Sequence, residues 1–262
     1  MSRQFTVSSG DVSLRCSDNE SSGPAIVFLN GAFGTRRDWR RVLGRIGDRY
    51  RCITFDARGR GRSSQSREYS FAADLGDVAE VVAATGVDQL ILAGWSHGAA
   101  LAVRYAAEHP GAIAGLVLVD GAFPVPPPTD AEKQQALRLF KRLAPIMRVM
   151  SAFGASARMS ATQAASLNIE LRSIIHTLSA DYGRLTCPVD FLVGSKRSVG
   201  TTEEKSHAMR AAVEQLAAVH PNVSLFRTVP ASHTQLLRNY PSAVVEAIDD
   251  IARKAVLPWQ AS

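Results

Sequence analysis

The sequence predicts an α/β protein in which a mainly parallel sheet carries helices on both faces. Strand-like and helix-like segments alternate along most of the 262 residues, an alternation that is typical of parallel sheets. Several strand-like segments, such as PAIVFLN and QLILAG, are unbroken apolar runs, as expected of strands that are buried on both faces. In such a sheet, functional side chains gather at the carboxyl ends of the strands.

The individual elements follow from apolar spacing and turn residues. Strands are predicted where short apolar runs end in glycine or a polar turn. In chain order they comprise an opening hairpin (5–7 and 12–16), PAIVFLN, the start of RCITFDARGRGRSS, QLILAG, GLVLVDG, VDFLVG and VSLFRTV. Helices are predicted between them from apolar residues three or four apart: one carrying Trp39, one capped by Ser70, an alanine-rich one ending at His109, one around 209–218 and a last one carrying Val244, Ile248 and Ile251.

The segment after GAFPVPPPTD breaks this alternation. Its three consecutive prolines cannot continue a helix or a central strand, and the following residues contain helical patterns but no convincing strand. Phe140, Leu143, Met147 and Met150 share one face of a predicted helix. We therefore expect one domain, 1–262, with 124–185 inserted as a helical cap over the strand ends. The inner face of the cap walls a pocket, packs as a satellite core, or does both.

The basic character of the chain does not by itself indicate a nucleic-acid partner. The formal net charge is +6, and eleven of the 25 arginines fall within 36–67. In TRRDWRRVLGRIGDRY, however, Trp39, Val42 and Ile46 form an apolar stripe, so the arginines occupy the solvent face of a helix. No nucleic-acid-binding motif accompanies them. An anionic carrier or a coenzyme A thioester bound through the arginines of 36–51 is the weaker alternative.

Other sequence features favour a cytoplasmic protein. The first residues form no apolar signal region, and no apolar run approaches the roughly 18 residues of a membrane span. Cys16, Cys52 and Cys187 are far apart and lack metal-ligand spacing, so neither a disulfide framework nor a zinc site is expected. We expect a small-molecule substrate, no membrane partner, no metal and no organic cofactor.

The stretch Gly94-Trp95-Ser96-His97-Gly98 is the one most indicative of chemistry. It matches G-x-S-x-G between a predicted strand and a predicted helix, the context that this motif requires. Such a tight turn strains the serine, and the two glycines remove side chains that would clash there. The His97 amide then points toward an oxyanion formed at Ser96. The alternative is a purely structural turn.

A nucleophilic serine needs a base to accept its proton, and His233 is the best placed of the six histidines. It follows the last predicted strand by a short loop, which puts it at the carboxyl edge of the sheet. The His97 side chain is expected to point away from the serine hydroxyl. The remaining histidines belong to helix ends or helix surfaces: His109, His176, His207 and His220.

With these segments in this order, the sequence resembles the α/β-hydrolase-fold proteins that carry a cap. FLNGAFGTRRDW is similar to the family's His-Gly loop, with Asn30 where histidine is usual. FDARGRGRS is similar to its Asp-x-Arg-Gly-x-Gly-x-Ser loop, and ASH matches the segment of the catalytic histidine. The resemblance implies that Ser96 is the nucleophile, that His233 is the base, and that Ala32 and His97 supply the oxyanion-hole amides. Dehalogenases and epoxide hydrolases of this family have an aspartate at the position of Ser96.

The acid of the implied triad is not at its usual place. Most relatives have an acid soon after the strand equivalent to PVDFLVG, whereas this chain reads GSKRS (194–198). Asp120, at the carboxyl end of GLVLVD, is the preferred substitute, since some relatives place their acid there. In other relatives an aspartate at this position is structural, and that role stays open. The weaker candidates are Asp190, Glu203 and Glu204.

The favoured function is a serine hydrolase that cleaves a small or medium apolar ester, lactone or thioester through an acyl-enzyme on Ser96. Carbon–carbon bond hydrolysis or cyclisation of a biosynthetic intermediate stays open, because one fold supports many chemistries. A ligand-binding protein with little or no turnover is the alternative favoured by the missing acid near Arg197. The predicted substrate pocket comprises Phe33, Trp95, Met147 and Met150.

Overall fold

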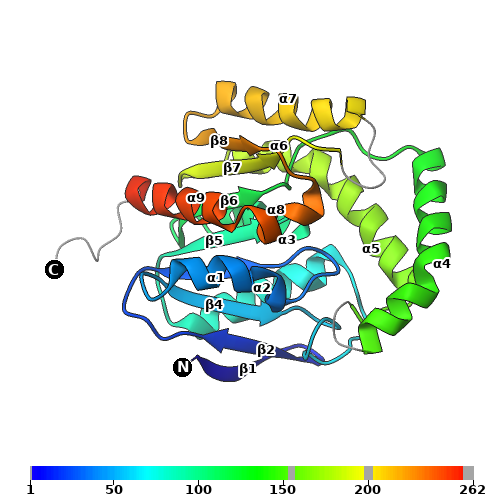
Figure 1. Cartoon of the computed structure of the whole chain (residues 1–262), viewed down its shortest axis with the longest axis horizontal. Coiled ribbons are helices and arrows are strands. Elements are labelled where there is room, and N and C mark those ends of the chain that lie inside the picture. Colours follow the sequence, from blue (N-terminus) through cyan, green and yellow to red (C-terminus); the bar gives the residue numbers. More distant parts are fainter. Residues whose placement is uncertain (1, 153–156, 198–202, 256–262) are drawn as a thin grey trace.

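One eight-stranded sheet forms the centre of the chain (Figure 1). This computed structural model describes residues 2–152, 157–197 and 203–255. The strand order is β1-β2-β4-β3-β5-β6-β7-β8. The β1–β2 and β2–β4 pairs are antiparallel and the others are parallel, which confirms the α/β class. The strands are Arg3–Ser9 (β1), Val12–Asp18 (β2), Ala25–Leu29 (β3), Arg51–Asp56 (β4), Leu90–Trp95 (β5), Ile113–Val119 (β6), Val189–Gly194 (β7) and Val223–Val229 (β8).

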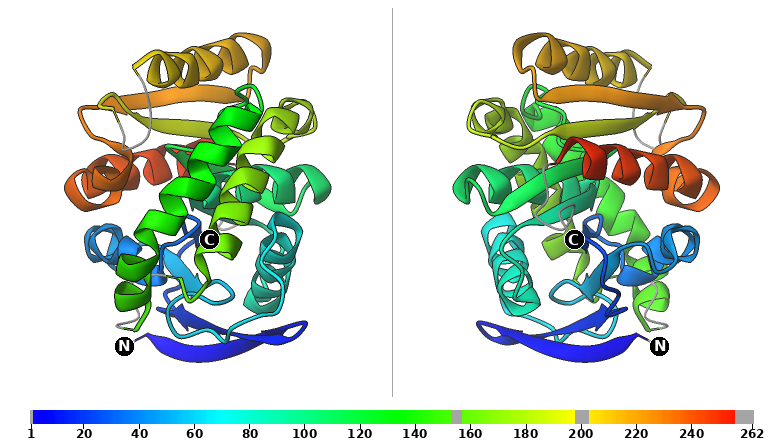
Figure 2. Two further views of the ribbon diagram at one scale, coloured as in Figure 1. Left: turned by 90° about the vertical axis from the view of Figure 1, so that its right-hand side faces the viewer. Right: turned by 90° about the vertical axis from the view of Figure 1, so that its left-hand side faces the viewer.

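Helices lie on both faces of the sheet (Figure 2). Helices α2, α3, α6 and α7 contribute to the apolar cluster on one face, and α1, α8 and α9 contribute to the cluster on the other. Their bounds are Arg40–Ile46 (α1), Phe71–Thr85 (α2), His97–Glu108 (α3), Leu178–Tyr182 (α6), Glu203–Val219 (α7), Leu236–Asn239 (α8) and Pro241–Lys254 (α9), with short 3-10 helices at Arg36–Trp39, Ile175–Thr177 and His233–Gln235.

Strand β5 illustrates why the central strands are continuously apolar. Leu90 and Leu92 belong to the cluster on one face, whereas Ile91 and Ala93 belong to the cluster on the other. Successive side chains of a strand point to opposite faces, so no position is left for a polar residue until the strand ends. Burying each of the larger side chains contributes about 1.5–3 kcal/mol. The sheet therefore holds the end of β5, next to Ser96, in a fixed place.

The predicted Ser70 cap of α2 is also confirmed. The Ser70 hydroxyl accepts a hydrogen bond from the Ala73 N–H (3.1 Å), the contact expected of an N-cap residue. The helix ends at Gly86, whose φ of +66° lies in the left-handed region that glycine adopts without strain. These signals fix the register of α2, which brings two aspartates to the buried side of the helix.

Between β6 and β7 the chain leaves the sheet and forms α4 (Asp130–Ala152), α5 (Ala161–Ile174) and then α6. Helices α4 and α5 lie beyond the carboxyl ends of the parallel strands (Figures 1 and 2). A small apolar cluster joins them to the loop after β3. Its members are Phe33, Phe140, Met147, Met159, Ala164 and Ala165.

The three cysteines are free and buried. Burial raises the pKa of Cys16 and Cys52 to about 12, which keeps these thiols protonated and unreactive. Within the described ranges, none of the helices combines the length and the apolar character that a bilayer span demands.

Candidate active site

Ser96 lies on the sharp turn between β5 and α3. Its φ of +58° and ψ of −113° are rare for a residue with a side chain and cost on the order of 1–3 kcal/mol. A β-carbon on Gly94 would overlap the backbone of Gly98, and one on Gly98 would overlap the carbonyl of Leu29. Strand, turn and helix pass so closely that both positions require glycine.

The end of β6 packs directly against this turn. The Ser96 N–H donates to the Val119 carbonyl (3.0 Å). A β-carbon on Gly121 would lie 2.7 Å from Ser96 Cα and 2.9 Å from Ala99 Cβ, so glycine is required there too. Asp120, which lies between Val119 and Gly121 in the chain, has a φ of +47°. The same strand end therefore supports two residues in unusual backbone conformations, Ser96 and Asp120.

His233 and Asp120 meet at the carboxyl edge of the sheet. His233 follows β8, and its Nδ1 lies 2.7 Å from Asp120 Oδ2. The other carboxylate oxygen, Oδ1, accepts from the Gly194 N–H (2.9 Å), so the carboxylate is held from two sides. The side chains of His233 and Asp120 are 29% and 11% exposed. With Nδ1 facing the carboxylate, Nε2 lies on the opposite side of the ring.

Trp95 links the histidine to the serine turn. Its indole stacks on the His233 ring, with centroids 5.3 Å apart and planes inclined by 29°. On the loop after β3, a β-carbon on Gly31 would lie 3.0 Å from the indole. The stack thus places the imidazole against the side chain of the residue that precedes Ser96.

The other candidate acids lie elsewhere. Asp190 is buried near the start of β7, where Lys254 Nζ lies 2.6 Å from its Oδ1. Glu203 and Glu204 open α7. Of the carboxylates considered from the sequence, Asp120 is thus the one in contact with His233.

The two expected oxyanion-hole residues, Ala32 and His97, are both buried. Ala32 is in the loop after β3, and His97 is the first residue of α3, where backbone N–H groups have no acceptor within the helix. Asn30, which replaces the usual histidine of the resembled family, donates from Nδ2 to the Phe55 carbonyl (2.6 Å). Its side chain therefore ties the loop to β4.

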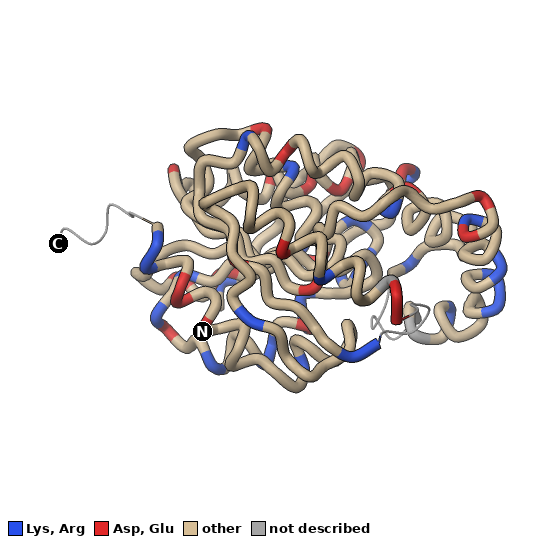
Figure 3. Tube along the Cα trace, turned by 90° about the horizontal axis from the view of Figure 1, so that it is seen from above, with Lys and Arg blue, Asp and Glu red and all other residues tan. Residues whose placement is uncertain are grey.

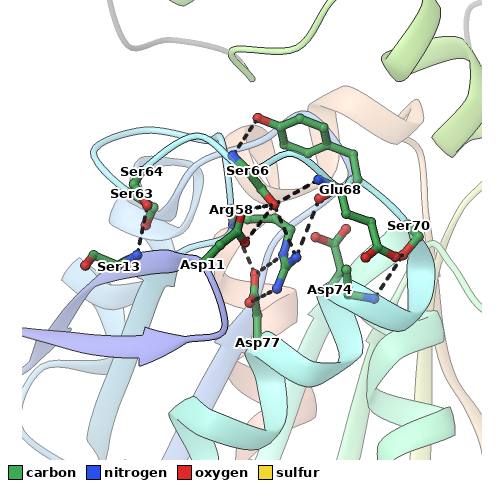
Figure 4. Close-up of polar contacts among 12 residues, drawn as sticks. Asp11, Ser13, Arg58, Ser63, Ser64, Ser66, Glu68, Ser70, Asp74 and Asp77 are labelled. Carbon is green, nitrogen blue, oxygen red and sulfur yellow. Dashed lines mark hydrogen bonds and ion pairs between the residues drawn. The ribbon is translucent and has the colours of Figure 1, made fainter.

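A buried ion network connects Ala32 with His97. Arg60 Nε donates to the Ala32 carbonyl (3.0 Å), and its two terminal nitrogens each lie 2.9 Å from one oxygen of Asp74. His97 Nε2 lies 2.8 Å from Asp74 Oδ2. The Arg60 and Asp74 side chains are each 1% exposed. Arg58, in the same loop, forms a second buried ion pair with Asp77 of α2 (Figure 4).

The charges in this network stabilise one another. Burial, the largest influence on Asp74, would raise its pKa, but the Arg60 charge and the His97 hydrogen bond outweigh it and lower the pKa to about 2. Asp74 is therefore a carboxylate at neutral pH. A fixed buried charge of this kind holds the side chains around it in one geometry.

The sequence interpretation missed Arg60 and Asp74. Their signal was a second arginine in DARGRGRS and an aspartate three residues after Phe71, on the apolar face of a predicted helix. A charge at a core position requires a partner, so the pattern indicates that Asp74 is paired. The partner could not be identified without the packing of α2 on the loop.

The expected pocket residues separate into two groups. Trp95 stacks on His233. Phe33 and Met147 belong instead to the apolar cluster that joins α4 and α5 to the loop after β3, in which the Phe33 and Phe140 rings lie 5.3 Å apart. The side chain of Met150 lies outside the described part of the structure. Within the described residues, no three His, Cys, Asp or Glu side chains are grouped as metal ligands.

Comparison with known proteins places the chain in a family. Residues 24–166, more than half of the chain, match the family described as alpha/beta hydrolase fold. The chain is similar to a fluoroacetate dehalogenase from Burkholderia sp., at 31% identity over 117 residues, which are 42% of this chain and 38% of that protein. It is also similar to the sn-1-specific diacylglycerol lipase of Mus musculus, at 32% identity over 105 residues, 39% of this chain and 34% of that protein. The matches thus span little more than a third of these relatives, both of which are hydrolases.

The likeness among solved structures is broader but shows the fold alone. A thermophilic esterase from Thermogutta terrifontis superimposes with a TM-score of 0.73 at 23% identity, over 96% of this chain and 98% of that one. The family match, the order of the strands in the sheet and the sharp turn at Ser96 after β5 all indicate the same fold. The chain belongs to the alpha/beta hydrolase fold family.

Proposed function

We propose that this chain is a serine hydrolase that cleaves a small or medium apolar ester, lactone or thioester. The observation that carries the proposal is the His233–Asp120 contact of 2.7 Å beside the strained Ser96 turn. A serine, a carboxylate and a histidine, in that order along the chain, are the groups that acyl transfer requires in this fold.

In the proposed reaction, Ser96 Oγ attacks the substrate carbonyl carbon while His233 Nε2 takes the hydroxyl proton. The N–H groups of Ala32 and His97 donate to the resulting oxyanion. His233 then passes its proton to the departing alcohol or thiol, and the acyl group stays on Ser96. Water, deprotonated by His233, attacks the acyl-enzyme and releases the acid. Asp120 holds the imidazole orientation and offsets the positive charge that develops on it.

The substrate class is inferred from the nucleophile and the inserted helices. A serine at position 96, rather than the aspartate of dehalogenases and epoxide hydrolases, favours a carbonyl substrate. The names of two similar proteins, a diacylglycerol lipase and an esterase, point the same way. We propose that α4 and α5 act as the cap and that Phe33 and Met147 offer the substrate an apolar wall.

Hydrolysis of a p-nitrophenyl ester tests this function. The parent protein should release p-nitrophenolate with an initial burst as the acyl-enzyme forms, and Ser96→Ala should abolish the release. Ser179→Ala, a serine exposed on α6, is the matched control and should retain parental rates. Equal activity in the parent and Ser96→Ala would reject the hydrolase and support the binding-protein alternative.

A further inference from the structure

Three arginines line a groove beside β2, and Ser96 is not among the residues that line it. The groove has a volume of about 550 Å³ and is lined by Arg15 on β2, Arg62 in the loop after β4 and Arg158 before α5. Arg15 pairs in register with Asp56, the last residue of β4. The groove therefore opens at the same edge of the sheet as the candidate active site.

The three arginines of the groove have no ion-pair partner among the described residues. Basic residues are spread over the molecule (Figure 3), and several are neutralised: Arg36 pairs with Asp56, Arg49 with Asp249 and Arg51 with Asp18. By contrast, no described carboxylate lies within 4.0 Å of the guanidinium groups of Arg15, Arg62 or Arg158. The groove thus brings together three arginines that no described carboxylate neutralises.

The groove is held in shape before any ligand arrives. Arg15 Nη1 donates to the Thr6 hydroxyl (2.9 Å). Arg158 donates from its backbone N–H to the Gly59 carbonyl (2.6 Å) and from Nη2 to the Ser63 carbonyl. Arg158 Nε is buried and, among the described residues, has no hydrogen-bond partner. Two of the three guanidinium groups are therefore anchored, and one keeps a buried donor unused.

Hydroxyl groups complete the lining. The Ser64 Oγ accepts from the Ser13 N–H (2.8 Å), and Figure 4 shows Ser13, Ser63 and Ser64 together beside β2. Because Ser64 is an acceptor in this contact, its own O–H can donate into the groove. Guanidinium forks with hydroxyl donors match the charge and geometry of phosphate oxygens.

We propose that this groove binds a phosphoryl group. A dianion offsets the converging positive charges, and its several oxygens accept from the guanidinium groups and the Ser64 hydroxyl together. The site differs from the arginines of 36–51, for which the sequence had suggested an anionic carrier. It also differs from the serine site, so phosphate binding does not depend on the proposed hydrolysis.

The adjoining hollow indicates the source of the phosphoryl group. A second hollow of about 580 Å³ shares Gln65 and Arg158 with the groove and is also lined by Met147 and Met159. Both methionines pack in the cluster that contains Phe33, the residue after Ala32. A phosphorylated substrate seated in the groove would extend past Arg158 into this second hollow and along its two methionines, toward the cluster that contains Phe33. This part of the inference rests on the proposed hydrolase function.

Titration calorimetry of the full chain with inorganic phosphate at low ionic strength tests the groove itself. Arg62→Gln removes an exposed guanidinium with little risk to folding, and Arg15→Gln is the second variant. Each should weaken phosphate binding about 10-fold or more, since charge-assisted hydrogen bonds are lost. Arg45→Gln, at an exposed position of α1, makes the same charge change elsewhere, and this variant should bind phosphate as the parent does. Absence of binding by the parent, or equal weakening by all three variants, overturns the proposal.

The source of the phosphoryl group is tested with two thioesters that differ only in that group, hexanoyl-pantetheine 4′-phosphate and hexanoyl-pantetheine. The phosphorylated one should have a KM about 10-fold lower, and Arg62→Gln should remove the difference. If the two thioesters have equal KM values while calorimetry still shows phosphate binding, the groove binds free phosphate and not a phosphorylated substrate. If the parent hydrolyses neither thioester nor the p-nitrophenyl ester, the proposed function fails while the calorimetric result still decides the groove.

Discussion

His233 Nδ1 and Asp120 Oδ2 lie 2.7 Å apart although 113 residues separate them along the chain. Each residue follows a strand of the same sheet, and parallel strands bring their carboxyl ends to one edge. The contact therefore follows from the topology. An aspartate that also accepts the Gly194 N–H (2.9 Å) presents a fixed oxygen to the imidazole.

Asp120→Asn should lower kcat by roughly 10⁴-fold, because the amide no longer stabilises the imidazolium or the required tautomer. The substitution conserves side-chain size, so the fold should persist. Steady-state ester hydrolysis with circular dichroism measures both effects. Asp190→Asn is the matched control. It removes the buried negative charge that lies 2.6 Å from Lys254 Nζ and should cost about 1–3 kcal/mol of stability, with kcat nearly unchanged. Mild, equal effects on kcat would remove Asp120 from the mechanism.

Arg60→Lys should lower kcat about 10-fold while leaving KM within about 2-fold. Arg60 donates from Nε to the Ala32 carbonyl (3.0 Å) and from its two terminal nitrogens to the Asp74 carboxylate. Lysine keeps the charge but cannot make these contacts together, so the expected oxyanion-hole loop would shift. Arg60 acts here as a positioning residue, through Ala32.

Arg58→Lys is the control for that variant. Arg58 is in the same loop and pairs with Asp77 (2.7 Å), but its side chain makes no contact with Ala32 among the described hydrogen bonds. Arg58→Lys is therefore expected to lower the free energy of unfolding without lowering kcat. If both variants lose kcat equally, the effect comes from the loop as a whole rather than from the Arg60–Ala32 contact.

The Asp74 carboxyl should titrate with a midpoint near pH 2, compared with 3.8 for a free aspartate. Because its folded pKa is lowered, Asp74 stabilises the fold above about pH 4, and this contribution disappears as the pH falls through 2. The difference corresponds to about 2 kcal/mol. The ¹³Cγ chemical shift of Asp74, followed by NMR, measures the midpoint directly. A midpoint at or above 3.8 would show that the Arg60 and His97 contacts do not outweigh burial.

The sequence was most informative where a single strand or turn decided the outcome. The unbroken apolar run before Ser96 predicted β5, the two flanking glycines predicted the sharp turn, and the strand ends made Asp120 and His233 neighbours. In each case the backbone alone sets the position, so local pattern and topology suffice.

Side-chain partners across elements were beyond such reasoning. The stacking of Trp95 on His233 and the reach of His97 to Asp74 depend on how α2, α3 and the loops pack together. Many rotamers satisfy the same sequence pattern until neighbours exclude them. The groove lined by Arg15, Arg62 and Arg158 could not be predicted from the sequence either, because these three arginines are far apart in the chain.

Two glycine substitutions should have opposite effects on the stability of the fold. Gly121→Ala places a methyl group 2.7 Å from Ser96 Cα and 2.9 Å from Ala99 Cβ, and such overpacking costs about 1–3 kcal/mol. Because the displaced atoms belong to the Ser96 turn, kcat should fall as well. Gly76→Ala, in the exposed middle of α2, meets nothing within 4 Å and should add about 0.5–1 kcal/mol of stability through helix propensity, with parental kcat. Urea unfolding and ester hydrolysis of the two variants measure both quantities, and a fully active Gly121→Ala would contradict the close packing of β6 on the serine turn.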